Sequence, residues 1–161
     1  MIDMAVDHGV LEHILPVTWK SQITAWLIED TPSFDVGGFV VGSDQRTATL
    51  WGKSSGILAG VPFFNEVFAQ CGCTVQWHAR EGSHIETHQQ HGGGKIALAT
   101  VTGPAHGLLE GERVALNILA RCSGVASSSR RLLVNLRSAG YRGILAGTRK
   151  TASVILPRLQ T

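Results

Sequence analysis

Apolar residues recur at helical spacing near the start of the chain. The stripe consists of Trp19, Ile23, Trp26 and Leu27. Its period predicts a helix over residues 16–30 with these side chains facing a core, and Thr18 is a candidate cap. The helix is expected to end by Asp30, because Thr31 precedes Pro32 and a residue before proline is disfavoured in helical geometry.

Shorter apolar runs and one further helical stripe follow this helix. Residues 33–44 are irregular, and strands are predicted at 47–53, 56–59, 74–78 and 96–101. A second helix is predicted at 61–70, and its buried face would consist of Phe63, Phe64, Val67 and Phe68. This order fits a sheet covered on one face by helices, so residues 1–103 are predicted to form an N-terminal α/β sandwich of the α+β class.

The pattern changes to a long helical region at Pro104, a residue that suits a first helical turn. We expect Ser123-Gly124 to kink or break this region and Ala139-Gly140 to end it. The short apolar run at 143–147 predicts a buried strand. Residues 104–161 are therefore interpreted as the opening of a second, βα-type domain.

Composition narrows the classes of protein. The 161 residues are 43% apolar and 16% charged, with a formal net charge of +2, which favours a folded core and gives no basic footprint for nucleic acid. The three cysteines do not make an even disulfide set, no apolar run approaches membrane-spanning length, and the N-terminus lacks a secretory pattern. We expect a cytoplasmic protein with reduced thiols and no membrane partner.

Two basic motifs are candidates for anion binding. Arg149 and Lys150 follow the predicted strand at the end of the chain, and ligands in parallel α/β folds meet the carboxyl ends of strands. On the long helix, Glu112, Arg113 and Asn117 share a side, and the guanidinium fork of an arginine suits a planar carboxylate. Each motif is also compatible with charges that simply face solvent.

Other chemical motifs are incomplete. His84 and His88 would share a helical face, but their Gln- and Gly-rich surroundings predict a loop, and no cysteine or carboxylate completes a zinc set. The run at 92–95 lacks the ending of a phosphate-binding loop and is interpreted as a hairpin turn. The sequence predicts neither a metal site nor a catalytic nucleophile.

Five ordered motifs resemble the quinolinate phosphoribosyltransferase family. They are Gly60-Val-Pro-Phe-Phe64, Gly103-Pro-Ala-His106, Glu112-Arg-Val-Ala-Leu-Asn117, Ser123-Gly-Val-Ala126 and Gly147-Thr-Arg-Lys-Thr151. Each motif is modest alone, but their order and spacing are similar to the vertebrate form over most of residues 11–151.

The resemblance implies a sandwich domain followed by an open α/β barrel, and an enzyme that transfers phosphoribosyl from 5-phosphoribosyl 1-diphosphate to quinolinate. The products would be nicotinate mononucleotide, carbon dioxide and diphosphate, a step of NAD biosynthesis. The resemblance further implies that Arg113 reaches quinolinate from a neighbouring subunit of a homodimer or larger homo-oligomer. It implies that Thr148, Arg149 and Lys150 bind quinolinate, and that Mg²⁺ accompanies the phosphoribosyl diphosphate.

The resemblance stops after Thr151, whereas a complete barrel of this type needs about 200 residues or more. We therefore expect a C-terminally truncated chain, with an incomplete barrel, an ordered sandwich at 16–103 and a loosely held 104–161. Three functions stay open. The chain has the family's transferase activity, although alone it would be inactive; it is an inactive isoform acting only as a dimerisation or interaction module; or it is a small carrier-like binding module.

Overall fold

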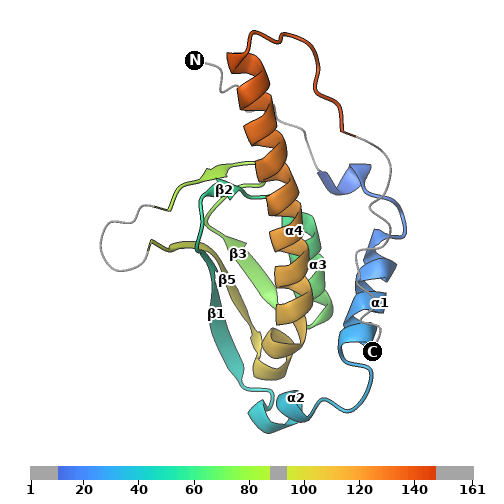
Figure 1. Ribbon diagram of the computed structural model, residues 1–161. Helices are drawn as coiled ribbons and strands as arrows, with labels where there is room; N and C mark the ends of the chain where they lie inside the picture. Colours follow the sequence, from blue (N-terminus) through green and yellow to red (C-terminus); the bar gives the residue numbers. More distant parts are fainter. Residues whose placement is uncertain (1–10, 88–93, 148–161) are drawn as a thin grey trace, which may run out of the picture.

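A three-stranded antiparallel sheet forms one layer of the molecule, in a computed structural model that describes residues 11–87 and 94–147 (Figure 1). Its strands are β1 (Gln45–Gly52), β5 (Ile96–Pro104) and β3 (Thr74–Trp77), in that spatial order. The central strand is thus the last in sequence, and it pairs with both neighbours at Thr100. The strands predicted at 47–53, 74–78 and 96–101 are confirmed.

Helices cover one face of this sheet. α3 (Val61–Gln70) and the first half of α4 (Ala105–Ser138) lie against the sheet, and α1 (Trp19–Asp30) packs on the other side of these two helices (Figure 1). A second, two-stranded sheet pairs β2 (Gly56–Ile57) with β4 (His84–Ile85) beside α4. Two short helical segments complete the fold, a 3₁₀ turn at Leu11–Ile14 and α2 (Val36–Val41). The predicted α+β sandwich is confirmed.

The hydrophobic core lies between the sheet and the helices. Its members include Ile23 and Leu27 of α1, Phe64, Val67 and Phe68 of α3, Leu98 and Val101 of β5, and Val114, Ala115 and Leu119 of α4. Burying each large apolar side chain contributes about 1.5–3 kcal/mol. The first half of α4 therefore shares a core with residues before 103, so its packing differs from the expectation that everything after 104 is loosely held. The domain boundary at 103/104 stays a prediction.

α2 forms where the sequence predicted irregular chain, so that prediction was wrong. A glycine pair weakens the helical signal, and the segment is held by contacts to the start of α4 instead. The backbone N–H groups of Ala105 and His106 donate to the carbonyl oxygens of Asp44 and Gly42, at 2.9 and 3.0 Å. These bonds tie the chain just after α2 to the start of α4, against which α2 packs.

α4 continues through Ser123-Gly124, where a kink or break was predicted, so the break does not occur. The Ser123 hydroxyl bonds to both backbone groups of Ala59, at 3.0 and 3.1 Å, and the Ser127 hydroxyl accepts from the Ile57 N–H at 2.8 Å. Serine breaks helices when its hydroxyl competes for nearby backbone groups. Here both hydroxyls bind the β2 region, so the helix runs on for 34 residues, about 50 Å.

The strand predicted at 143–147, the first strand of the barrel, is absent from the structure, so that prediction was also wrong. The helix does end near the predicted stop, with Ala139 as cap and Gly140 in a left-handed conformation at φ 84°. Beyond it, the Arg137 guanidinium donates to the carbonyl oxygens of Tyr141 and Gly143, at 2.8 and 2.9 Å. A strand needs a neighbouring strand for its hydrogen bonds, and no described strand lies beside this segment.

Candidate functional site

Arg113 lies on the solvent-facing side of α4. The opposite side of the helix is fixed in the core by Val114 and Ala115, so the backbone beneath Arg113 is held firmly. About three quarters of the Arg113 side chain is exposed, and one of its terminal nitrogens donates to Asp30 Oδ1 at 3.1 Å. The structure therefore presents a guanidinium on a rigid support, as an anion site requires.

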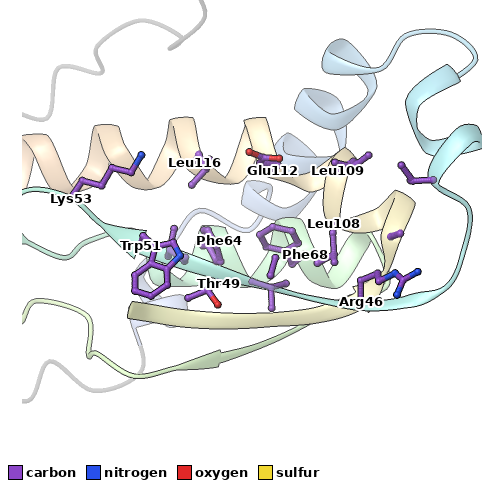
Figure 2. A pocket seen from close by; sticks show the side chains of 15 residues that line it. Arg46, Thr49, Trp51, Lys53, Phe64, Phe68, Leu108, Leu109, Glu112 and Leu116 are labelled. Carbon is purple, nitrogen blue, oxygen red and sulfur yellow. The ribbon is translucent and has the colours of Figure 1, made fainter. Parts of the chain in front are cut away.

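A groove of about 770 Å³ runs between β1 and α4, on the side of α4 that faces β1 (Figure 2). Phe64 and Phe68 of α3 line its interior, while Leu109 and Leu116 line its α4 wall. Both leucines are partly exposed, at 47% and 39%. Glu112 adds a carboxylate to the same wall, next to Arg113 in sequence but on a different side of the helix.

Two cations stand at opposite ends of this groove, Arg46 and Lys53 (Figure 2). Arg46 bonds to Asp44 at 3.2 Å with both side chains largely exposed. Sequence reasoning did not select either residue. The available signal was a strand of alternating residues with a basic side chain near each end, which also describes many solvent-facing strands. The groove can accommodate an apolar group with anionic ends.

Of the four residues predicted to bind quinolinate, the structure places only Arg113. Thr148, Arg149 and Lys150 lie outside the described residues. The sequence grouped Glu112 and Asn117 with Arg113 on one side of the helix. Both are exposed, but Glu112 faces the groove and not the side of Arg113, so that part of the grouping was wrong. Asp30, the partner of Arg113, was missed because it is 83 residues away in the sequence.

The histidines that suggested a metal site are engaged separately. His78 Nε2 lies 2.8 Å from the Thr100 hydroxyl, and His106 Nδ1 lies 3.3 Å from the Gly42 carbonyl oxygen. Within residues 11–87 and 94–147, no three His, Cys, Asp or Glu side chains are grouped to hold a metal ion. His88 and His91 fall outside the described residues.

The cysteines are free thiols held in or near the core. Burial, with a smaller contribution from the charge of Glu110, raises the pKa of the Cys71 thiol to about 12. Burial likewise raises the pKa of Cys73 and of Cys122. A thiol with a raised pKa forms little thiolate at neutral pH, so these three side chains act as packing groups and not as nucleophiles.

None of the helices in the described part of the chain combines the length and apolar character needed to cross a bilayer.

Comparison with known proteins identifies the domain. Residues 24–123 match the family model described as the quinolinate phosphoribosyl transferase N-terminal domain. The chain is 46% identical over 136 residues to the human nicotinate-nucleotide pyrophosphorylase [carboxylating], covering 84% of this chain and 43% of that protein. The Dictyostelium discoideum protein of the same name is 42% identical over 137 residues, covering 80% and 46%.

A solved structure gives the same result for the fold. The crystal structure of NadC from Streptococcus pyogenes superposes with a TM-score of 0.67 at 27% identity, over 77% of this chain and 44% of that one. The chain spans less than half the length of the curated relatives named above. The family match includes the sheet, α3 and the stretch of α4 that carries Arg113. The chain therefore belongs to the quinolinate phosphoribosyltransferase family, through that family's N-terminal domain.

Proposed function

We propose that this chain serves in the transfer of phosphoribosyl from 5-phosphoribosyl 1-diphosphate to quinolinate, yielding nicotinate mononucleotide, carbon dioxide and diphosphate. The observation that carries the proposal is an exposed arginine, Arg113, on a helix that is anchored in the core and lies inside the family match. By resemblance, we assign to Arg113 the part of the arginine that reaches quinolinate in this family. The names of the relatives support the same reaction, because they are nicotinate-nucleotide pyrophosphorylases [carboxylating].

The chemistry suits the side chains that this chain supplies. Quinolinate carries two carboxylates, so a site that binds it needs several convergent cations. Arg113 provides a fork of donors for one carboxylate, and we assign Thr148, Arg149 and Lys150 to the same ligand by resemblance. The pyridine nitrogen attacks the anomeric carbon as diphosphate leaves, and loss of carbon dioxide leaves electron density on the ring that nearby cations stabilise. The protein orients the two substrates and supplies positive charge, and it forms no covalent intermediate with them.

We propose that Mg²⁺ enters with the phosphoribosyl diphosphate, whose phosphate oxygens are its natural ligands. The described residues offer it no site, since they contain no group of three His, Cys, Asp or Glu side chains suited to a metal ion. No step is therefore assigned to the ion through this part of the chain.

A neighbouring subunit is needed in this proposal. One exposed guanidinium cannot hold a diacid, and Arg113 faces away from the core of its own chain. We propose that Arg113 reaches the site of a second subunit in a homodimer or larger assembly, in the cytoplasm. These 161 residues alone are then expected to form no product, because the structure describes no barrel against which Arg113 could close a site.

A complementation assay tests the proposal. The full-length human relative, with the arginine that matches Arg113 replaced by alanine, is co-expressed and co-purified with this chain. Nicotinate mononucleotide formed from quinolinate, the phosphoribosyl donor and Mg²⁺ is then measured by mass spectrometry. We expect no product from either protein alone, product from the complex, and loss of product with Arg113→Ala in this chain.

Arg121→Ala is the matched control, because Arg121 is also exposed on α4 and should leave complementation intact. A complex that forms but stays inactive would favour the second function, an interaction module without turnover. Product from this chain alone, or no complex at all, would contradict the proposal.

A further inference from the structure

Asp30 is the last residue of α1, and its carboxylate is the partner of Arg113. The carboxylate is mostly buried, with 20% of its side chain exposed, while 74% of the Arg113 side chain is exposed. The pair thus joins a sheltered anion to a cation that extends into solvent.

The position of Asp30 is unfavourable for an acid by local rules. The C-terminus of a helix carries partial negative charge, which favours Lys, Arg or His in the last turn and disfavours carboxylates. α1 has no basic residue in its last turn and ends with Glu29 and Asp30. An acid in such a place indicates a role set by tertiary structure, and the contact with Arg113 supplies one.

α1 is a firm support for this carboxylate. Ile23 and Leu27 anchor the helix in the core, and the Thr24 hydroxyl bonds to Gln70 of α3 at 2.9 Å. At the end of the helix, the Thr31 N–H donates to the Leu27 carbonyl oxygen at 3.0 Å, which closes the last turn beside Asp30. The Asp30 carboxylate is therefore held in place by the packing of its own helix.

The contact leaves Arg113 able to bind a ligand. Within the described part of the chain, its one hydrogen bond uses a single terminal nitrogen and a single carboxylate oxygen. A guanidinium has five N–H donors, so a full bidentate edge remains for an incoming carboxylate. Asp30 fixes the direction of the side chain without occupying the donors that a ligand needs.

We infer that Asp30 is a positioning residue, which holds the Arg113 guanidinium in the orientation that receives a quinolinate carboxylate. This inference rests on the proposed function. An arginine on an exposed helix face loses side-chain entropy when it binds a ligand, and an arginine already oriented loses less. The effect acts on substrate binding, so it raises KM when removed and changes kcat little.

The sign of the effect separates positioning from simple electrostatics. Quinolinate is a dianion, so removing a negative charge near its site would lower KM if Asp30 acted only through its charge. Loss of positioning raises KM. In the complementation complex, Asp30→Asn is expected to raise the KM for quinolinate about tenfold with kcat changed less than about twofold, and Asp30→Glu to recover part of the loss.

Glu29→Gln is the matched control, because it removes the same charge from the same helix end. The exposed Glu29 side chain makes no hydrogen bond or ion pair with another described residue. It should leave KM unchanged or slightly lower. If wild-type chain restores activity and Asp30→Asn has an equal or lower KM, the positioning inference is wrong while the proposed function stands. If wild-type chain restores nothing, both fail.

A second measurement tests the orientation in this chain alone. The Nε–H group of Arg113, observed by ¹⁵N relaxation, is expected to be more rigid than that of Arg121, which is exposed on the same helix. Asp30→Asn should make the two arginines equally mobile, while far-UV circular dichroism shows that the fold is retained. Equal mobility already in the wild-type chain would overturn the inference.

Discussion

At the scale of single residues, Gly107 allows the backbone of α4 to lie against the backbone at Cys71, just after α3. α4 passes over the turn after α3 at Gly107, where an added Cβ would collide with the carbonyl oxygen of Cys71 and lie 3.3 Å from Cys73 Sγ. The colliding atom belongs to backbone, so it cannot rotate away as a side chain would. This contact fixes the distance between α4 and α3.

Gly107→Ala is expected to lower the free energy of unfolding by about 2–4 kcal/mol, because α4 must shift away from the Cys71 carbonyl. Urea denaturation of the purified chain measures the change. Gly124→Ala is the matched control in the same helix, since its Cβ would meet nothing within 4 Å, and alanine there should stabilise by up to about 1 kcal/mol. A Gly107→Ala variant as stable as wild type would show that α4 is not held this close to the Cys71 carbonyl group.

At the scale of secondary-structure elements, the N-terminus of α3 shows how distant residues complete a helix. Its cap is Gly60, in a left-handed conformation at φ 104° that glycine adopts without strain. No side chain next to the helix satisfies the first N–H groups. The Glu81 carboxylate does so, accepting from Gly60 N–H at 3.0 Å and from Val61 N–H at 2.8 Å. A negative charge at the N-terminus of a helix also interacts favourably with the helix dipole.

Glu81→Gln is expected to lower the free energy of unfolding by about 1–2 kcal/mol, because the amide loses the charge and one acceptor oxygen. Thermal or urea unfolding measures it. Glu29→Gln serves as the control, because Glu29 lies near the C-terminus of α1, where a negative charge is unfavourable. This substitution should be neutral or slightly stabilising. Equal effects of the two substitutions would show that Glu81 is not a cap.

Predictions from sequence succeeded for elements whose signal is local. The apolar face of α3 and the stripe of α1 specified both helices, because a helix that buries one face must repeat apolar residues at its own period. Predictions from sequence failed where contacts with distant segments determine the local structure. Ser123 and Ser127 bond to Ala59 and Ile57 and so do not break α4, and α2 packs against the start of α4.

In the candidate site, too, local features could be predicted from the sequence and long-range contacts could not. Arg113 was selected by a motif of adjacent residues on one helix together with the family resemblance, and its role stays a prediction. Neither Asp30 nor the groove between β1 and α4 could be predicted, because both need the relative placement of segments far apart in the chain.

At the scale of the whole molecule, α4 has two different environments. Its first half is buried at Gly107, Gly111, Val114, Ala115 and Leu119. Its second half has Val125, Leu132 and Val134 exposed, at 61%, 50% and 47%. Stability is not uniform along such a helix, because amides open more easily where few apolar contacts hold the segment.

Hydrogen exchange followed by mass spectrometry should therefore find residues 108–122 protected to the same extent as the central strand β5. Residues 125–138 should exchange faster by about tenfold or more. The central strand serves as an internal reference within the same sample. Uniform exchange along all of α4 would contradict this division and would indicate that a further surface covers the second half.

The amino-acid sequence by itself determined the family, the helices α1 and α3 and the strands of the sheet, and it selected the arginine that we assign to quinolinate. Each of these features is encoded by residues close together in the sequence, either as a periodic apolar pattern or as a short motif. Tertiary structure alone decided that α4 is unbroken, that no strand forms at 143–147 among the described residues, and that Asp30 meets Arg113. The physical reason is that hydrogen bonds and ion pairs between distant segments depend on where the folded chain places each group, and local pattern does not encode that placement.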